Sequence, residues 1–174
     1  MYVKDFEEII RALQELSEDD LRKLIRAFFA KNVSRGNVQP LHGAGEHGKD
    51  LVAVVDNIQE PLGRTQILFI QVKKGEITQT DWNNRIIGQM QDALNSLEAE
   101  FPRGTSRDNP RRLLLFLSGE LTPEASTSIS AWNRNQPIPV EVFSIFGIWD
   151  LFRKYGVKPS DFPDLLVLAK TLNL

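Results

Sequence analysis

The chain has 174 residues, of which 41% are hydrophobic and 25% charged, values typical of one globular domain with its own core. It has no cysteine, which excludes disulfides and thiolate zinc sites, and its net charge of -2 excludes a generic polycation. No apolar run approaches the roughly 20 residues of a membrane span, so we expect a cytosolic protein with no membrane partner.

The first half of the chain predicts two helices followed by a hairpin. Apolar residues at helical spacing predict a helix over 6–16, and Ser17 before an acidic turn predicts the cap of a second helix over about 19–31. The glycine-rich segment 34–49 is predicted to be a loop. Two β-rich runs then follow, with a turn region containing Pro61 and Gly63 between them, and they cover residues 51–55 and 67–72.

The second half alternates helices with apolar strands. A regular stripe of apolar residues starting at Trp82 predicts a helix of about twenty residues. Thr122 and Pro123 have the capping pattern of a helix start, and Gly156 that of a helix stop. The predicted elements are a helix over 82–101, a strand over 112–118, a helix over 122–133, a strand over 140–146, a helix over 148–155 and a tail helix over about 161–172.

Strands that are apolar on both faces and separated by helices predict an α/β fold with a central mixed sheet flanked by helices. No linker or repeat divides the chain, so we expect a single domain. Within it we distinguish an N-terminal helical segment (1–33) packed on the core, the core itself (34–157) and a C-terminal helical tail (158–174).

The second β-rich run ends in polar residues where a core strand would stay apolar. Alternation puts Gln71 and Lys73 on the same face, and a buried lysine needs an anionic partner. An antiparallel register symmetric about Pro61 and Leu62 would set Asp50 opposite Lys73. The sequence therefore predicts that a carboxylate, an amide and an ammonium group gather at one end of the sheet.

These residues resemble a known motif. The stretch "GEHGKDLV" (45–52) followed by "IQVKK" (70–74) is similar to the Mrr-type branch of the PD-(D/E)xK nucleases, which has G-[DE]-x-G-x-D before one strand and Q-x-K at the end of the next. The helix "DWNNRIIGQMQDAL", the strand "RRLLLFLSGELT" and the segment "VEVFSIFGIWDLFRKYG" also match the family's order of elements. The resemblance covers about residues 40–156 and implies a restriction-endonuclease-like core.

The resemblance implies a Mg²⁺-dependent endonuclease that hydrolyses DNA, with Mn²⁺ as an alternative metal. Asp50, the Gln71 side chain and the main-chain carbonyl of Val72 would hold the metal, and Lys73 would orient the attacking water. Gln71 replaces the more common acid, and Glu46 would compensate for the lost charge. The long helix would border the site, which makes Gln89 a supporting residue.

The same resemblance suggests restriction or defence against foreign DNA as the setting. Lys74 beside the site, with Arg103, Arg107 and Arg111 from the loop "FPRGTSRDNPRR", would contact the phosphate backbone. The chain has no recognisable DNA-reading module. A separate recognition or NTPase subunit, a fused domain or a homodimer would therefore bring it to its target.

Each of these interpretations has a simpler alternative. Asp50 and Lys73 can be a structural ion pair, Gln71 a satisfied core amide, and Glu46 an ordinary loop residue. His42 and His47 do not make a zinc site, because no further histidine or cysteine completes it. The second functional hypothesis is a catalytically silent nuclease-fold module for nucleic-acid binding or assembly. Its contact surface would be the first two helices, including Phe28 and Phe29, unless these helices belong to the core.

Overall fold

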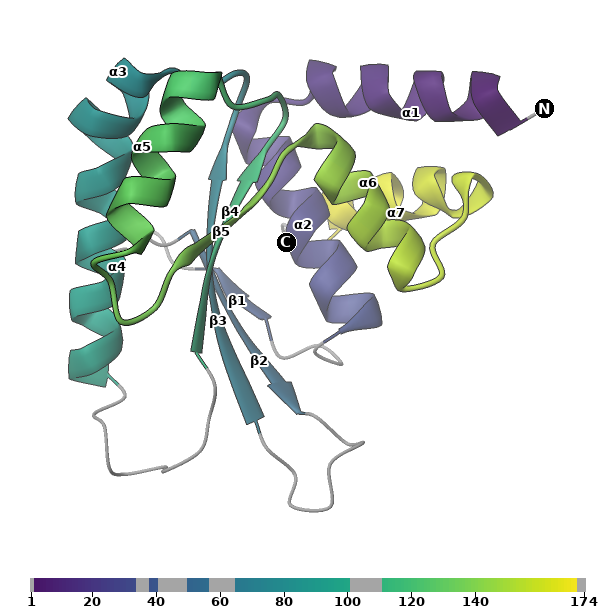
Figure 1. Ribbon diagram of the computed structural model, residues 1–174. Coiled ribbons are helices and arrows are strands. Elements are labelled where there is room, and N and C mark those ends of the chain that lie inside the picture. The colour runs from purple at the N-terminus through teal and green to yellow at the C-terminus, as the bar shows by residue number, and fades with distance from the viewer. Residues whose placement is uncertain (1, 34–37, 41–49, 57–64, 101–110, 172–174) are drawn as a thin grey trace.

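The computed structural model describes residues 2–33, 38–40, 50–56, 65–100 and 111–171, and shows one sheet with helices on both sides (Figure 1). The strands are β1 (Val38–Pro40), β2 (Leu51–Asp56), β3 (Thr65–Lys73), β4 (Arg111–Leu117) and β5 (Val140–Phe143). The helices are α1 (Tyr2–Glu15), α2 (Glu18–Asn32), α3 (Gln79–Asp81), a π-helical turn (Trp82–Ile86), α4 (Ile87–Glu100), α5 (Pro123–Asn133), α6 (Ile145–Lys154), a 3₁₀ turn (Pro159–Asp161) and α7 (Phe162–Thr171). These elements confirm the predicted α/β class.

The sheet is mixed and its strands follow the order of the chain. β1, β2 and β3 pair antiparallel, whereas β3, β4 and β5 pair parallel. The predicted hairpin of β2 and β3 is confirmed, but its predicted register is wrong. Leu51 pairs with Ile70, so the ladder extended by one residue leads from Asp50 to Gln71 rather than to Lys73. The slip is two residues, and an even slip leaves every side chain on its predicted face.

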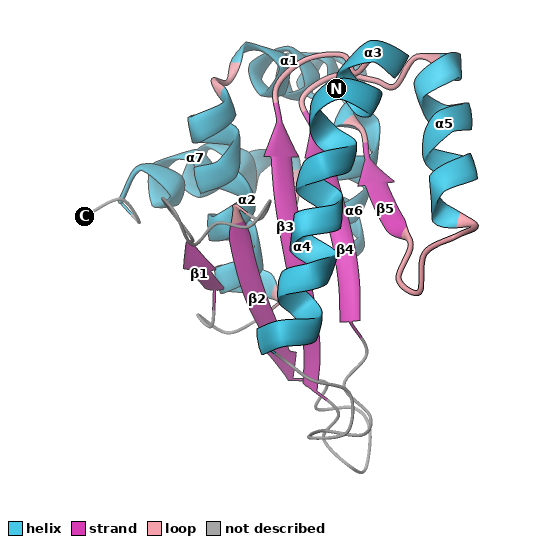
Figure 2. Cartoon of the chain, turned by 90° about the vertical axis from the view of Figure 1, so that its left-hand side faces the viewer, coloured by secondary structure: helices cyan, strands magenta, loops and turns pink. Residues whose placement is uncertain are grey.

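Two hydrophobic cores lie on the two faces of the sheet. Alternate residues of β3 point to opposite faces of the sheet. Leu68, Ile70 and Val72 belong to the core beneath α1, α2, α6 and α7. Ile67 and Phe69 belong to the core beneath α4 and α5. Figure 2 shows α4 running along the second face of the sheet. A sheet covered on both faces explains why its strands are almost continuously apolar.

Phe28 and Phe29 belong to the first core, so they cannot form the exposed contact surface of the assembly hypothesis. Their side chains are 0% and 3% exposed, and the Phe28 ring stacks on Phe152 with 4.3 Å between centroids. The alternative in which these helices are part of the core is confirmed. Among the described residues no helix has both the length and the apolarity that crossing a membrane requires.

Several helix boundaries follow the predicted capping signals. Ser17 caps α2 by accepting a hydrogen bond from the Asp20 N–H, and Thr122 caps α5 in the same way from Ala125. Gly156 follows α6 with a φ of 81°, in the left-handed region that favours glycine.

Three elements differ from the sequence prediction. The short edge strand β1 lies inside the segment predicted to be a loop, because three residues ending in proline carry no strand signal. β5 ends at Phe143, and Ile145 and Phe146 begin α6 instead of extending the strand. The long helix contains a π turn, closed by the hydrogen bond from the Ile87 N–H to the Trp82 carbonyl.

Candidate functional site

The three residues predicted to be catalytic come together in the interior of the protein. Asp50 immediately precedes β2, and Gln71 and Lys73 end β3; the three are 5%, 3% and 7% exposed. With Ser118, they are the buried polar and charged residues of the described chain. Burying two ionisable groups is costly unless they are paired, so their presence at one sheet end marks this position as a candidate site.

Asp50 is held by a main-chain donor beyond the end of the β2 ladder. Its Oδ2 atom accepts a hydrogen bond of 2.7 Å from the Val72 N–H, and its own N–H donates to the Ile70 carbonyl at 2.9 Å. Burial raises the pKa of the Asp50 carboxyl, and the Val72 N–H, Arg22 and Lys73 act in the opposite direction. The carboxylate is thus fixed in position while its charge remains only partly compensated.

Helix α2 adds two residues that the sequence analysis did not include. Ser17 caps the helix, which places Glu18 in its first turn and Arg22 one turn later. Arg22 Nη2 lies 3.0 Å from Asp50 Oδ1 and 3.5 Å from Glu18 Oε1. The Glu18 Oε1 atom also lies 3.6 Å from Lys73 Nζ. We call Glu18, Arg22, Asp50 and Lys73 the charge cluster; its two carboxylates and two cations cancel formally.

Lys73 therefore pairs with Glu18 rather than with the predicted partner Asp50. The hypothesis of an Asp50–Lys73 structural ion pair is not supported, because the ion pairs of these two residues go to Arg22 and Glu18. Lys74, next along the chain, is exposed, and its main-chain N–H points to Glu18 Oε2 at 3.4 Å. Glu18 thus links the ends of β3 and α2.

Two buried amide oxygens, one on β3 and one on α4, have no hydrogen-bond partner within the described part of the chain. They are the Oε1 atoms of Gln71 and Gln89. Alternation directs Gln71 to the face of the sheet that α4 covers, and Gln89 lies on α4. Unpaired buried acceptors are uncommon, and within the described residues the Gln71 amide oxygen lacks the partner that a satisfied core amide would have.

The π turn accounts for how the long helix keeps its apolar stripe against the sheet. Trp82, Ile86, Met90 and Leu94 are all buried although they are spaced four residues apart. In a regular α-helix each step of four drifts by about 40°, and a wider turn absorbs part of this drift. Gln89 lies three residues after this turn and is half-buried.

The ends of β3 and β4 are held together just after the site. The Gly75 N–H donates to Ser118 Oγ at 2.9 Å, and the Ser118 N–H donates to the Lys73 carbonyl at 3.2 Å. Gly119 lies so close to Gly75 that a Cβ at position 119 would be 2.5 Å from the Gly75 carbonyl carbon. Glycine is therefore required at position 119 to keep the strand ends, and with them Lys73, in place.

Lys74 and Arg111, the described members of the predicted DNA-contacting set, lie at different ends of the sheet. Arg111 begins β4 and pairs with Ile67, and the six-residue span from Ile67 to Lys73 corresponds to about 20 Å. Glu46, Arg103 and Arg107 lie outside the described residues. Among the described residues predicted to contact DNA, only Lys74 adjoins the charge cluster.

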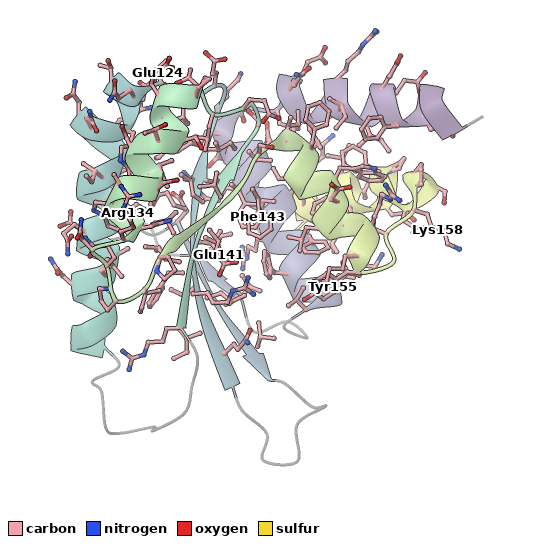
Figure 3. The ribbon with its side chains drawn as sticks, in the orientation of Figure 1. Glu124, Arg134, Glu141, Phe143, Tyr155 and Lys158 are labelled. Carbon is pink, nitrogen blue, oxygen red and sulfur yellow. The ribbon has the colours of Figure 1, made fainter. Side chains whose placement is uncertain are left out.

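A second ion pair lies at the far end of the sheet. Arg112 donates to Glu141 through Nε at 2.7 Å and also through Nη2, and Glu141 raises the pKa of the Arg112 guanidinium. Glu141 and Phe143 extend from β5 on the side of α6, whose C-terminal end carries Tyr155 (Figure 3). This pair joins neighbouring strands and has no contact with the charge cluster among the described residues.

Glu18 and Arg22 had only a weak signal in the sequence. They are four residues apart on one helix face, as in many solvated helix pairs, and the acidic first turn is fully explained by helix capping. Nothing in the sequence links position 18 to position 73, because that contact depends on how α2 packs against the sheet.

Comparison with known proteins does not assign the chain to a family. No family model, curated protein or solved structure matches it. The nuclease resemblance therefore rests on the two sequence motifs and the order of the predicted elements.

The site offers oxygen ligands of the kind that Mg²⁺ prefers. Asp50 and Glu18 share a cationic partner, and the Gln71 oxygen is buried without a hydrogen-bond partner in the described chain. The Val72 carbonyl lies on the same side of β3 as its N–H, toward Asp50. Within the described ranges, no group of three or more His, Cys, Asp or Glu is arranged so that it could hold a metal ion. A metal bound here would therefore depend on the amide and main-chain oxygens beside the two carboxylates, and oxygen donors suit a hard cation that retains several waters better than they suit zinc.

Proposed function

We propose that the protein is a metal-dependent endonuclease that hydrolyses DNA phosphodiester bonds. The observation that carries this proposal is the burial of Asp50, Gln71 and Lys73 together at one end of the sheet. Glu18 joins them from α2 through its contact with Lys73. Burial of ionisable groups at a sheet end is a recurrent property of catalytic sites.

Four groups are proposed to hold the metal: the carboxylates of Asp50 and Glu18, the Gln71 amide oxygen and the Val72 carbonyl. When bound, Mg²⁺ or Mn²⁺ would neutralise charge on the phosphate and lower the pKa of water. Replacing an acid with Gln71 removes one negative charge, and Glu18 supplies one from a different element. The predicted supporting residue Glu46 stays a proposal.

Lys73 is proposed to act on the reacting groups directly. Its ammonium group can donate a hydrogen bond to the attacking water and stabilise the negative charge that develops as water oxygen bonds to phosphorus and the ester oxygen leaves. The contact with Glu18 would hold the Lys73 side chain at the mouth of the site. Gln89 and the exposed Lys74 are proposed to support the substrate, Lys74 by contacting a phosphate.

The restriction-endonuclease-like core is part of the same proposal. The order of two helices, an antiparallel pair and two further parallel strands joined by helices supports it. We further propose a cytosolic setting in restriction or defence against foreign DNA. Recognition would come from a separate subunit, including an NTPase subunit, or from a homodimer.

The test is cleavage of supercoiled plasmid and linear DNA by the purified protein with Mg²⁺, with Mn²⁺ and with EDTA. We expect metal-dependent cleavage that Asp50→Ala and Lys73→Ala abolish. Lys158→Ala is the matched control, since it removes the same charge from an exposed position after α6, outside the proposed site. Cleavage that persists unchanged in Lys73→Ala would show that the site assignment is wrong.

The silent-module hypothesis retains one favourable observation. Asp50 is already paired with Arg22, and the charge cluster is formally neutral without a metal. A protein of this kind would bind DNA in a gel-shift assay, or bind a partner protein, and would leave DNA intact under every metal condition. Metal-dependent cleavage that Lys73→Ala abolishes would exclude the silent module.

A further inference from the structure

A single nitrogen atom of Arg22 lies between the two carboxylates of the site. Nη2 is 3.0 Å from Asp50 Oδ1 and 3.5 Å from Glu18 Oε1. A divalent cation shared by Asp50 and Glu18 would lie between the same two oxygens. We propose that Arg22 is an internal cation that occupies the metal position in the metal-free protein and must withdraw for a metal ion to bind. This inference rests on the proposed function, since it concerns the affinity of the same site.

Electrostatics explains why the metal-free protein needs such a cation. Asp50 is 7% exposed in its side chain, so water cannot screen its charge, and Glu18 brings a second negative charge close to it. Without a cation between them the two carboxylates would repel each other. Lys73 compensates Glu18, and Arg22 is the residue that contacts both acids. A bound divalent ion would supply the same compensation and make the guanidinium redundant.

The surroundings of Arg22 allow this withdrawal. Nη1 already contacts Asp19 Oδ1 at 2.8 Å, and the Asp19 side chain is 60% exposed. Asp19 can therefore remain the ion-pair partner of Arg22 when the guanidinium moves out of the site. The buried Nε of Arg22 has no hydrogen-bond partner in the described part of the chain. The guanidinium is thus incompletely satisfied in its present position, where charge rather than a full set of hydrogen bonds holds it. Moving toward Asp19 keeps one contact and gives up those to Asp50 and Glu18.

The direct test is Mn²⁺ affinity, measured by electron paramagnetic resonance of free Mn²⁺ during titration of the full chain. We expect Arg22→Gln to bind Mn²⁺ at least about tenfold more tightly than the unmodified protein, because the ion no longer displaces a guanidinium. Lys23→Gln is the matched control: it removes the same charge one residue away, where the described acids that Lys23 contacts are Asp19 and Asp20. We expect its affinity to stay within about twofold of the unmodified protein. Equal or weaker binding by Arg22→Gln, or an equal gain in Lys23→Gln, would overturn the inference.

A measurement on the unmodified protein covers the case in which Arg22→Gln does not fold. The Nε–H resonance of Arg22, assigned by its loss in Arg22→Lys, is followed by NMR while diamagnetic Mg²⁺ is added. Withdrawal predicts a shift that saturates together with the signals of Asp50 and Val72. An Arg22 resonance that stays in place while those signals saturate would exclude displacement.

DNA cleavage measured on the same samples separates this inference from the proposed function. Tighter Mn²⁺ binding by Arg22→Gln without any cleavage would support the inference and contradict the nuclease. Cleavage by the unmodified protein with no gain in affinity for Arg22→Gln would leave the nuclease standing and overturn the role of Arg22. Failure of both proteins to bind Mn²⁺ would overturn both.

Discussion

Asp50 accepts a 2.7 Å hydrogen bond from the main-chain N–H of Val72, so the carboxylate stands where the next rung of the β2–β3 ladder would be. The contact fixes a charged group inside the fold at the start of one strand and the end of another. Such a position costs stability, because burial disfavours the charged carboxylate and raises the pKa of this carboxyl.

Replacing this carboxylate with its amide isostere tests whether the buried charge of Asp50 lowers the stability of the fold. Asp50→Asn keeps an acceptor for the Val72 N–H and leaves Arg22 with Glu18 and Asp19. Because the folded-state pKa lies above the ordinary 3.8, the ionised carboxylate destabilises the fold above that range. We expect the variant to be more stable by about 1 kcal/mol at pH 7, as measured by urea denaturation, while losing metal-dependent cleavage.

The stability difference between Asp50→Asn and the unmodified protein should depend on pH. As the pH falls, Asp50 in the folded protein takes up its proton above the ordinary carboxyl pKa of 3.8, so the stability difference between the two proteins should fade as the pH approaches 3.8 and be absent below it. Asp20→Asn is the opposite case, since the hydrogen bond from Ser17 lowers the pKa of Asp20, and it should lose a little stability at pH 7. An Asp50→Asn protein that is less stable at pH 7 would show that the Arg22 contact outweighs burial.

Glu18 is expected to bind metal although it lies outside both sequence motifs. Glu18→Gln removes one of the two carboxylates that share Arg22 and should weaken Mn²⁺ binding by about tenfold or more. Asp20→Asn serves as the control, because it removes the same charge from the same helix turn without contacting Asp50 or Lys73. Isothermal titration calorimetry gives the Mn²⁺ affinity of both variants. Equal affinities would show that Glu18 is not a metal ligand.

Much of the fold could be predicted from local signals. The helix caps at Ser17 and Thr122 and the stop at Gly156 depend on neighbouring residues, and the structure has all three as expected. The convergence of Asp50, Gln71 and Lys73 was predicted from the ends of two apolar runs. It survived the wrong register because the slip of two residues preserved the faces.

The remaining differences arise from long-range packing. The partner of Lys73 comes from α2, 55 positions earlier in the chain, and no periodicity signals such a contact. The strand β1 is defined by its pairing with β2 and not by its own three residues. Likewise, the sequence alone is compatible with Phe28 and Phe29 in a contact surface or in the core, because the choice depends on the position of α6.

Helix α2 should prove essential to the core. Phe28→Ala removes a ring that is 0% exposed and stacks on Phe152, so we expect a loss of about 3–5 kcal/mol in unfolding free energy. Phe146→Ala is the control, because Phe146 is 49% exposed and makes a looser stack with Phe6, and it should cost less than about 1 kcal/mol. Denaturation curves that ranked the two variants equally would contradict the core assignment.

The close approach of Gly119 to Gly75 provides the last prediction. In Gly119→Ala the new Cβ would meet main-chain atoms of Gly75 and Glu76 at 2.5–2.7 Å, and main chain cannot move aside as a flexible side chain can. We expect a loss of about 1–3 kcal/mol in unfolding free energy. Because Gly75 also donates to Ser118, which in turn binds the Lys73 carbonyl, cleavage should fall more than stability alone explains.

Gly88→Ala is the matched control for that substitution. Gly88 lies in α4, where a Cβ would have no atom within 4 Å, so alanine should gain about 0.5–1 kcal/mol through its better helix propensity. Urea denaturation of the two variants should therefore give changes of opposite sign. A Gly119→Ala protein as stable and as active as the unmodified chain would mean that the strand ends can separate, and that Lys73 is not held by this contact.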